Sequence, residues 1–337
     1  MNRRRVVHVL SSSGFAGAEK VVSDIVNNLS SKYDFLVISY PNKDLREFVR
    51  AKIEFYNNVF DLWRLIYNYR PNIIHAHDYR ASLKVVILKI LGMNSKIISH
   101  IHANPKWAQK LNLFTFIFFI ASFLIDKIVY VSEAARKEFF FSKFLKNKTE
   151  VVYNSISNFE DAYKDEHFFR DIDIVFLGRF VDKKRPKLFI EVIKLLPQKY
   201  IVYMIGDGPL RAEIEKSAPS NVIFTGWVKD PRPLLKRAKV LLVTSQYEGF
   251  GLVILEALSA GVIPVSTKCG GPEEIIINGK TGFLVDDDPI TIATLLKEIL
   301  DNYENYQQVI LHNVGNVIIK FSRKNFLENI DKVYGEI

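Results

Sequence analysis

The chain alternates short apolar runs with longer amphipathic stretches. Runs rich in Val, Ile and Phe predict β-strands, and the stretches between them have the spacing of helices that bury one face. In the first half the predicted strands cover residues 6–12, 34–40, 73–77, 96–102 and 127–132. The predicted helices cover residues 18–29, 45–53, 62–69, 81–91, 107–124 and 133–140. Near-continuous apolar strands separated by helices predict a parallel sheet covered on both faces.

A polar and charged segment, residues 154–171, separates this series from a second one. The second series has predicted strands at residues 174–178, 200–205, 221–225, 240–244 and 263–266, and the last predicted helix covers residues 323–334. A chain of 337 residues is long enough for two domains. We therefore expect an α/β protein with two doubly wound Rossmann-like domains, residues 1–165 and 166–320, which face a central cleft, and a closing helix at residues 321–337. Ligands of such sheets bind beyond the carboxyl ends of the strands, so functional residues are expected there.

The excess of positive over negative residues lies entirely in the first half. Residues 1–170 contain 25 Lys and Arg against 16 Asp and Glu, whereas residues 171–337 contain 21 of each. Either surface lysines are distributed this way without a function, or the N-terminal domain faces an anionic membrane or an acidic substrate. The single cysteine, Cys269, excludes an internal disulfide and a cysteine-rich zinc module, and fits a reducing compartment. The basic N-terminus has no apolar core long enough for a signal peptide.

The most hydrophobic segment is residues 111–125, LNLFTFIFFIASFLI, with lysines on both sides. A helix that spans a bilayer needs about 20 apolar residues, and this run is shorter and contains Asn112, Thr115 and Ser122. It is therefore either a buried crossover helix or a helix that inserts one face into a bilayer surface.

Two loops that follow predicted strands have features of phosphate-binding loops. Residues 11–19, SSSGFAGAE, place Gly14 and Gly17 before a helix whose free N–H groups would face a ligand, although a plain turn would also explain them. Residues 178–186, GRFVDKKRP, place four cations directly after a strand. They form either an exposed basic loop or a clamp on a diphosphate.

The most specific motif is SQYEGFGLVILEALSAG, residues 245–261. Glu248 lies in a glycine-broken loop, and Glu256, after seven intervening residues, lies in the helix that follows. A buried carboxylate is costly unless it meets hydroxyls or other donors. Two carboxylates around a helix N-terminus suit sugar and ribose hydroxyls, and the free N–H groups near Phe250 and Gly251 suit a phosphate.

This segment resembles the E-x7-E signature of glycosyltransferase family 4, a large family of retaining enzymes with the two-domain GT-B fold. The resemblance covers almost the whole chain, because other family motifs appear in the same order. They are the glycine loop at residues 14–19, the pair Arg179 and Lys184, and residues 205–210, 225–228, 270–274 and 280–285. Each motif alone is weak, whereas the ordered series is specific.

The resemblance implies that Arg179 and Lys184 neutralise the leaving diphosphate in place of a metal ion. It also implies that Glu248 holds the donor sugar, that Glu256 binds the ribose and that the backbone near Val228 meets the base. The expected catalytic residues are His102, Arg179, Lys184 and Glu248, and the expected donor-binding residues are Gly14, Gly17, Val228, Phe250, Gly251, Leu252 and Glu256. No metal ion and no cofactor besides the donor are expected, and no nucleophile is assigned.

Two pairs of histidines, His75 with His77 and His100 with His102, end two predicted strands. A period of two places each pair on one face of its strand. Four imidazoles can bind zinc, but no cysteine or second motif joins them, so structural histidines are the alternative. The resemblance favours His102, which would contact the transferred sugar or assist the acceptor, with His77 as a second candidate.

Two further segments bear on these expectations. Asn154-Ser155 stands in the hinge where the family often has Asn-Gly, which puts domain closure in doubt but not the chemistry. Residues 286–288, three aspartates before Pro289, predict a helix start rather than a metal site.

The function implied is a retaining glycosyltransferase. It would move a sugar from a nucleotide-diphosphate sugar, with UDP the expected nucleotide, to a lipid-linked oligosaccharide in capsule, O-antigen or lipopolysaccharide synthesis. The basic first half and residues 106–125 predict a peripheral location on an anionic membrane, at the cytoplasmic face of the cell membrane.

The alternatives are a nucleotide-sugar epimerase or a catalytically silent nucleotide-sugar-binding protein of the same fold. A Rossmann oxidoreductase is disfavoured because GxGxxG is missing. No nucleic-acid partner is expected, because no aromatic residues are interleaved with the basic ones in a recognisable module.

Overall fold

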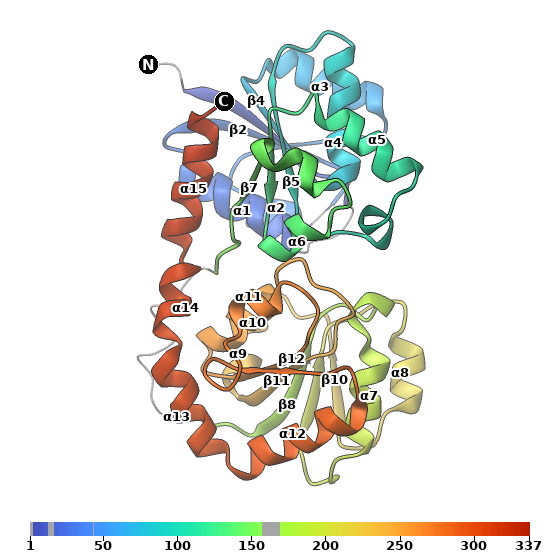
Figure 1. The fold of residues 1–337 in the computed structure, drawn as a ribbon, viewed down its shortest axis with the longest axis vertical. Helices are drawn as coiled ribbons and strands as arrows, with labels where there is room; N and C mark the ends of the chain where they lie inside the picture. Colours follow the sequence, from blue (N-terminus) through green and yellow to red (C-terminus); the bar gives the residue numbers. More distant parts are fainter. Residues whose placement is uncertain (1–2, 13–16, 43, 157–168) are drawn as a thin grey trace. The chain divides into compact units, whose positions relative to one another are not determined.

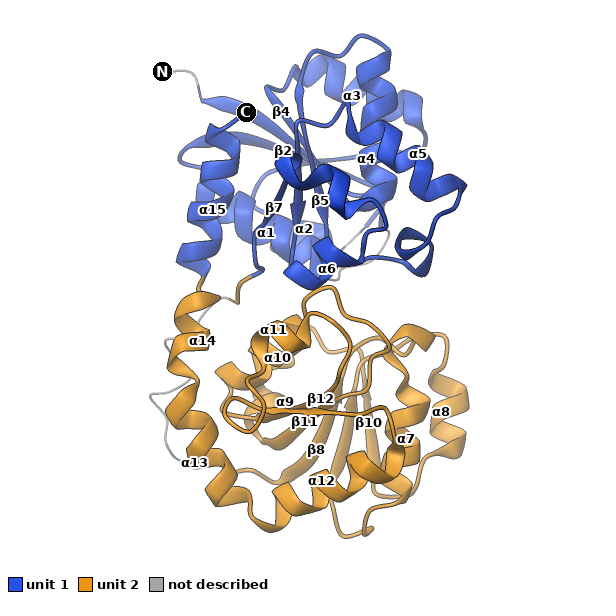
Figure 2. Cartoon of the chain, viewed as in Figure 1, with its two compact units in different colours: residues 1–154, 323–337 blue, residues 155–322 orange. Residues whose placement is uncertain are grey.

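The computed structural model describes residues 3–12, 17–42, 44–156 and 169–337. The chain divides into two compact units (Figure 2), Met1–Asn154 with Arg323–Ile337 and Ser155–Ser322. The expected boundary at 165/166 therefore differs from the observed one at 154/155. Most of the intervening segment, residues 157–168, lies outside the described residues.

The first unit is built on a seven-stranded parallel sheet (Figure 1). Its strands are β1 (Arg4–Val9), β2 (Tyr33–Ser39), β3 (Lys52–Phe55), β4 (Ile73–His77), β5 (Lys96–Ile101), β6 (Lys127–Tyr130) and β7 (Thr149–Val151). They lie in the order β3-β2-β1-β4-β5-β6-β7. The central strand β4 is buried at every residue, as expected for a strand covered on both faces.

Helices join these strands as parallel crossovers require. They are α1 (Gly17–Leu29), α2 (Leu45–Phe48), α3 (Val59–Tyr69), α4 (Asp78–Ile90), α5 (Leu113–Ser122) and α6 (Glu133–Glu138), with 3-10 turns η1 (Lys106–Gln109) and η2 (Ser142–Lys148). The C-terminal helix α15 (Arg323–Gly335) also belongs to this unit. Its buried side chains Phe326, Ile330 and Val333 join a core cluster with Val22 and Ile25 of α1. The last helix therefore completes the core that the first strands begin.

The second unit contains a six-stranded parallel sheet. Its strands are β8 (Ile172–Leu177), β9 (Val202–Ile205), β10 (Val222–Gly226), β11 (Ala238–Val243), β12 (Ile263–Thr267) and β13 (Phe283–Val285). The order β10-β9-β8-β11-β12-β13 is that of a doubly wound Rossmann sheet. Its helices are α7 (Pro186–Lys194), α8 (Arg211–Ser217), α9 (Arg232–Lys236), α10 (Leu252–Ser259), α11 (Pro272–Ile275), α12 (Pro289–Asp301), α13 (Tyr303–Asn313) and α14 (Gly315–Lys320), with the 3-10 turn η3 (Asp182–Lys184).

The two sheets confirm the predicted α/β class, and local differences have identifiable causes. The helix predicted over residues 107–124 is divided into η1 and α5. The turn ends at Gln109, and Asn112 caps α5, because its side chain accepts from Thr115 N at 3.0 Å. The helix predicted over residues 45–53 ends at Phe48, and β3 follows as an edge strand.

Candidate functional site

Three loops of the second unit meet at the carboxyl edge of its sheet, after the neighbouring strands β8, β11 and β12. The first two are joined where Gln246 N donates to Lys183 O at 2.8 Å and Thr244 Oγ1 donates to Lys184 O at 3.0 Å. The third joins them where Glu248 N donates to Cys269 O at 2.8 Å. The basic loop and the Glu248 loop, 60 residues or more apart in sequence, are therefore one structure.

Two backbone segments of this edge approach closely because one of them has a glycine at the contact. A Cβ at Gly271 would lie 2.3 Å from Phe250 Cα, so no other residue fits against that backbone. Gly251 has φ 98° and directly precedes α10. This left-handed conformation turns the chain from the Glu248 loop into the helix, so that the first turn of α10 begins at the sheet edge.

Lys184 and Glu248 form an ion pair in which Lys184 Nζ contacts Glu248 Oε1. Ser245 Oγ donates to the same oxygen at 2.6 Å. The Glu248 side chain is only 8% exposed. Burial tends to raise the pKa of Glu248, but the charges of Lys184 and Lys183 and the two hydrogen bonds outweigh it, so the pKa lies below its ordinary value. Glu248 is therefore a buried, ionised carboxylate.

The other expected site residues of the second unit lie on α10 and on the loops after β8 and β10. Leu252 and Glu256 lie one turn apart on α10, and the buried Phe250 ring packs against Phe321 with centroids 5.3 Å apart. Arg179 is exposed on the loop after β8, and Val228 is half-buried after β10. Among the described residues, the contacts recorded between these expected residues join Lys184 to Glu248 and do not include Arg179.

The first unit also gathers polar side chains at the carboxyl edge of its sheet. Lys84 Nζ donates to Tyr40 Oη at 2.5 Å and to Tyr56 Oη at 3.0 Å, and these tyrosines follow β2 and β3. The hydrogen bond from Lys84 is the main reason that the pKa of Tyr40 lies below its ordinary value. Gly17 is exposed at the start of α1, whereas Gly14 lies outside the described residues.

All four histidines of the two predicted pairs lie in one buried cluster of the first unit. His8 of β1 and Tyr334 of α15 join them. Burial lowers the pKa of all five histidines, that of His8 to about 3, so the rings are neutral. His102 directly follows β5, and its backbone N donates to Asp78 Oδ1 at 2.9 Å. Asp78 has φ 65°, a strained conformation for a residue other than glycine.

The histidine cluster does not fit a metal ion as it stands. Two triplets, His8 with His75 and His77, and His77 with His100 and His102, have ring nitrogens within 4.8 Å of one another. One pair in each triplet is hydrogen-bonded, His8 with His77 and His77 with His102, both at 2.9 Å, and His75 of the first triplet bonds His100 of the second at 3.1 Å. An ion at 2.0–2.1 Å from each nitrogen would have to replace those bonds. The arrangement is that of paired neutral imidazoles.

The sequence patterns missed three side chains of these two clusters. His8 is one of four consecutive buried residues at the end of β1, and its place in an apolar run was the signal that could have identified it as a buried histidine. Ser245 directly follows the residues predicted as a strand. Tyr334 gave no local signal, because it reaches His75 from 259 positions away.

The most hydrophobic segment forms an exposed apolar surface. Helix α5 buries Thr115, Phe118, Ala121 and Ser122. Its outer side is also apolar, and the exposed large side chains here, with neighbours from η2, are Leu111, Leu113, Phe114, Phe116, Ile117, Ile120, Phe123 and Phe144. The rings of Phe119 and Phe144 are 6.0 Å apart, so η2 lies beside α5. We call this set the α5 surface. A monomer rarely leaves so large an apolar patch without a partner.

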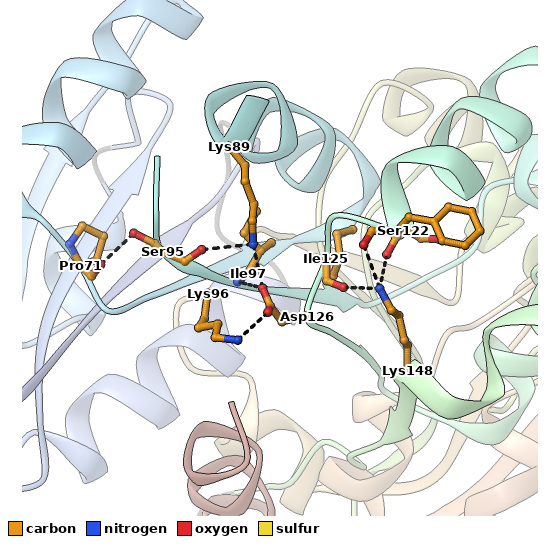
Figure 3. Close-up of polar contacts among 10 residues, drawn as sticks. Pro71, Lys89, Ser95, Lys96, Ile97, Ser122, Ile125, Asp126 and Lys148 are labelled. Atoms are coloured by element: carbon orange, nitrogen blue, oxygen red, sulfur yellow. Dashed lines mark hydrogen bonds and ion pairs between the residues drawn. The ribbon is translucent and has the colours of Figure 1, made fainter. Parts of the chain in front are cut away.

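The end of α5 is held firmly (Figure 3). Lys148 Nζ donates to the carbonyl oxygens of Ser122, Phe123 and Ile125 at 3.0–3.2 Å. Asp126, which follows at once, pairs with both Lys89 and Lys96 at 3.0 Å. Among the described helices, none combines the length and apolar character that crossing a membrane requires. The exposed apolar side chains therefore project from a rigid, short helix.

Comparisons with known proteins cover both units. The family model described as "Glycosyl transferases group 1" matches residues 159–313, and "Glycosyltransferase Family 4" matches residues 15–157. A Campylobacter jejuni N-acetyl-D-galactosaminyltransferase, named for an undecaprenol-PP-linked glycan, is 26% identical over 73% of this chain and 70% of its own. The Rhizobium meliloti lipopolysaccharide core biosynthesis glycosyltransferase LpsE is 36% identical over 45% of this chain and 46% of its own.

A solved structure extends the similarity of fold to nearly the whole chain. Anabaena Alr3699/HepE in complex with UDP and glucose matches with a TM-score of 0.87 at 16% identity, over 99% of this chain and all of its own. At that identity the match concerns the fold. The matched region spans less than half of LpsE, as stated above, so the substrates of these relatives do not transfer directly to this chain.

Proposed function

This chain belongs to glycosyltransferase family 4 and has the GT-B fold, and we propose that it is a retaining glycosyltransferase. It moves a sugar from a nucleotide-diphosphate sugar, with UDP as the nucleotide, to a lipid-linked oligosaccharide in the synthesis of a surface polysaccharide. The observation that carries this proposal is the ion pair between the half-buried Lys184 and the buried Glu248 at the carboxyl edge of the second sheet. The names of the relatives support the acceptor class and the pathway type.

Lys184 and Arg179 bind the donor diphosphate. The Lys184 ammonium has three donors, so it can contact a phosphate while it keeps its contact with Glu248. Arg179 is exposed on the same loop and can add a forked contact to phosphate oxygens. Two fixed cations stabilise the negative charge that develops on the leaving diphosphate, which is the role a metal ion would otherwise have.

Glu248 and Glu256 bind the hydroxyl groups of the donor. Both recorded side-chain contacts of Glu248 reach Oε1, so Oε2 can accept from a sugar hydroxyl. Glu256, one turn into α10, binds the ribose, and the backbone N–H groups at Phe250, Gly251 and Leu252 meet a phosphate at the helix N-terminus. The backbone near Val228 contacts the base.

The first unit binds the acceptor, with His102 at the carboxyl edge of its sheet. The α5 surface inserts into the membrane that holds the lipid-linked acceptor. Exposed lysines, Lys106 and Lys110 before α5 and Lys143 and Lys146 on η2, contact anionic headgroups. This proposal places the enzyme at the cytoplasmic face of the cell membrane.

Binding of the donor can be tested with a thermal-shift panel of UDP, GDP, ADP and NAD, each with EDTA. UDP is expected to raise the melting temperature and NAD is not. The Lys184→Met variant should lose the shift, whereas Lys194→Met, an exposed lysine at the far end of α7, should keep it. A shift with NAD alone, or none with any diphosphate, would remove the donor proposal. The anomeric configuration of the product, read by NMR against that of the donor, tests retention.

Membrane binding can be tested by flotation with anionic liposomes. The wild-type chain is expected to float with the vesicles, and Phe114→Ser to remain in the soluble fraction. Phe60→Ser is a matched control, because Phe60 is about as exposed (68% against 63%) but lies on α3. A wild-type chain that stays wholly soluble contradicts the membrane part of the proposal.

A further inference from the structure

Six side chains of the first unit, five of them buried and His102 half-buried, form one unbranched series of hydrogen bonds. Five are histidines from β1, β4 and β5 or its end, and the sixth is Tyr334 of α15. The links are His102 Nε2 to His77 Nδ1 (2.9 Å), His77 Nε2 to His8 Nδ1 (2.9 Å), His8 Nε2 to Tyr334 Oη (3.3 Å), Tyr334 Oη to His75 Nδ1 (2.8 Å) and His75 Nε2 to His100 Nδ1 (3.1 Å).

The positions of the protons on these hydrogen-bonded side chains depend on one another. Burial lowers the pKa of each histidine and raises that of Tyr334, so every member is neutral. A neutral imidazole has one N–H donor and one acceptor nitrogen, and each link needs one of each. The Tyr334 hydroxyl couples the tautomers on its two sides, because it donates to one neighbouring histidine and accepts from the other. Two arrangements satisfy all the links and also pair the Tyr334 hydroxyl proton: all five histidines protonated on Nδ1, or all five on Nε2. A third, in which Tyr334 accepts from both His8 and His75, leaves its buried hydroxyl proton without an acceptor and is disfavoured.

The two ends of the chain distinguish these arrangements. His102 Nδ1 and His100 Nε2 are buried, and neither has a partner among the described residues. With all protons on Nδ1, His102 presents an N–H in the field of the Asp78 carboxylate, which opposes the lowering of its pKa by burial. With all protons on Nε2, the wholly buried His100 ring would hold an N–H without an acceptor. An unpaired donor is the rarer defect in proteins, so the Nδ1 arrangement is favoured.

We propose that Tyr334 is a positioning residue that, through His8 and His77, holds His102 in its Nδ1–H tautomer. His102 then offers a hydrogen-bond donor at the carboxyl edge of the first sheet. Its Nε2 accepts from His77 and is not available as a base. The tautomer follows from the hydrogen-bonded side chains alone. The role of His102 as a donor to a substrate oxygen rests on the proposed function and requires the buried Nδ1 to become accessible when the substrate binds.

NMR of the ligand-free full chain tests the tautomers directly. Labelling only histidine with ¹⁵N and ¹³C gives seven imidazole groups, which single His→Gln variants assign. Long-range ¹⁵N–¹H correlations at pH 7.5 should show His8, His75, His77, His100 and His102 all as Nδ1–H. His312, exposed on α13, is an internal reference. Any Nε2–H ring or imidazolium among the five overturns the proposal, and the tautomers themselves are read from the wild-type spectrum.

The Tyr334→Phe variant tests the positioning role. The substitution interrupts the series of hydrogen bonds between His8 and His75 and removes the donor to His8. His102 should therefore change from a single tautomer to an exchanging mixture. Tyr33→Phe is the control, because Tyr33 packs against the Tyr334 ring at 5.1 Å but donates to Asp331. Its spectrum should match the wild type. An unchanged His102 in folded Tyr334→Phe contradicts the role of Tyr334. The nucleotide panel probes the second unit, so its failure is distinguishable from failure here.

Discussion

Glu248 stays ionised although it is buried, because Lys184 and Ser245 contact the same carboxylate oxygen. A carboxylate in that position costs free energy unless charged partners compensate, so both members of the pair depend on each other. Glu256, by contrast, is half-buried on the first turns of α10. At the scale of single residues, the proposed donor site therefore combines one preorganised ion pair with one more accessible carboxylate.

We predict that Lys184→Ala and Glu256→Ala each lower kcat/KM for the donor by about 30-fold. Removal of a charged hydrogen-bond partner from the transition state costs about 2 kcal/mol, and each 1.36 kcal/mol is tenfold in rate. Steady-state kinetics with the nucleotide sugar identified by the panel measure the effect. Lys194→Ala, the exposed control on α7, should be unchanged. Wild-type turnover in both site variants would rule out this donor site.

At the scale of elements, Asn112 lies between η1 and α5 and is the N-cap of α5. The Asn112 side chain accepts from Thr115 N, and its amide donates to Trp107 O at 2.5 Å and to Lys110 O at 3.0 Å. Asn112 therefore caps the helix and ties its start to the preceding 3-10 turn. Because a helix N-terminus has backbone N–H groups without partners, this cap also determines where the α5 surface starts.

We predict that Asn112→Ala destabilises α5 by about 1 kcal/mol, the usual cost of losing an N-cap. Hydrogen exchange should show protection of the α5 amides falling about fivefold. Asn28→Ala, an exposed asparagine on α1, should leave that protection unchanged. Equal protection of α5 in the two variants would mean that packing, rather than the cap, holds the helix start.

At the scale of the whole molecule, the C-terminal helix α15 packs in the same core as the first strand, β1. Arg4 Nη1 donates to Tyr334 O at 2.6 Å, and Asp331 accepts from Tyr33 Oη at 2.8 Å. The buried histidines share this core, so their protonation is linked to unfolding of the first unit. The folded-state pKa of His8 is about 3, below its ordinary value of 6.5.

We predict that stability falls as the pH is lowered from 6.5. In that range the unfolded chain binds a proton at His8 and the folded chain does not, so the free energy of unfolding decreases with falling pH. His8 alone accounts for about 2–3 kcal/mol between pH 6 and pH 4. Urea titrations across this range measure the slope, which should be shallower in His8→Gln and unchanged in His312→Gln. A wild-type midpoint that stays constant from pH 7 to pH 5 would contradict buried neutral histidines.

Local pattern was sufficient to predict the two parallel sheets and the loops at the carboxyl edge of the second. Alternation of apolar runs and amphipathic helices indicates two parallel sheets, because a strand between two helical layers must be apolar on both faces. Glu248 and Lys184 lie in loops that directly follow buried strands, which explains why they meet at one edge, whereas their expected roles came from the family resemblance. The short strands β3, β7 and β13 were missed. They lie toward the sheet edges, where the apolar pattern weakens.

The sequence by itself determined the fold class, the positions of the loops and the family, because these depend on local periodicity and ordered motifs. Only the tertiary structure decided which side chains meet. It brings His8, Tyr334 and the two histidine pairs into one chain of hydrogen bonds, and it joins Ser245 and Lys184 on one oxygen of Glu248. Contacts between residues hundreds of positions apart depend on how strands and the last helix pack, and no local pattern encodes that packing.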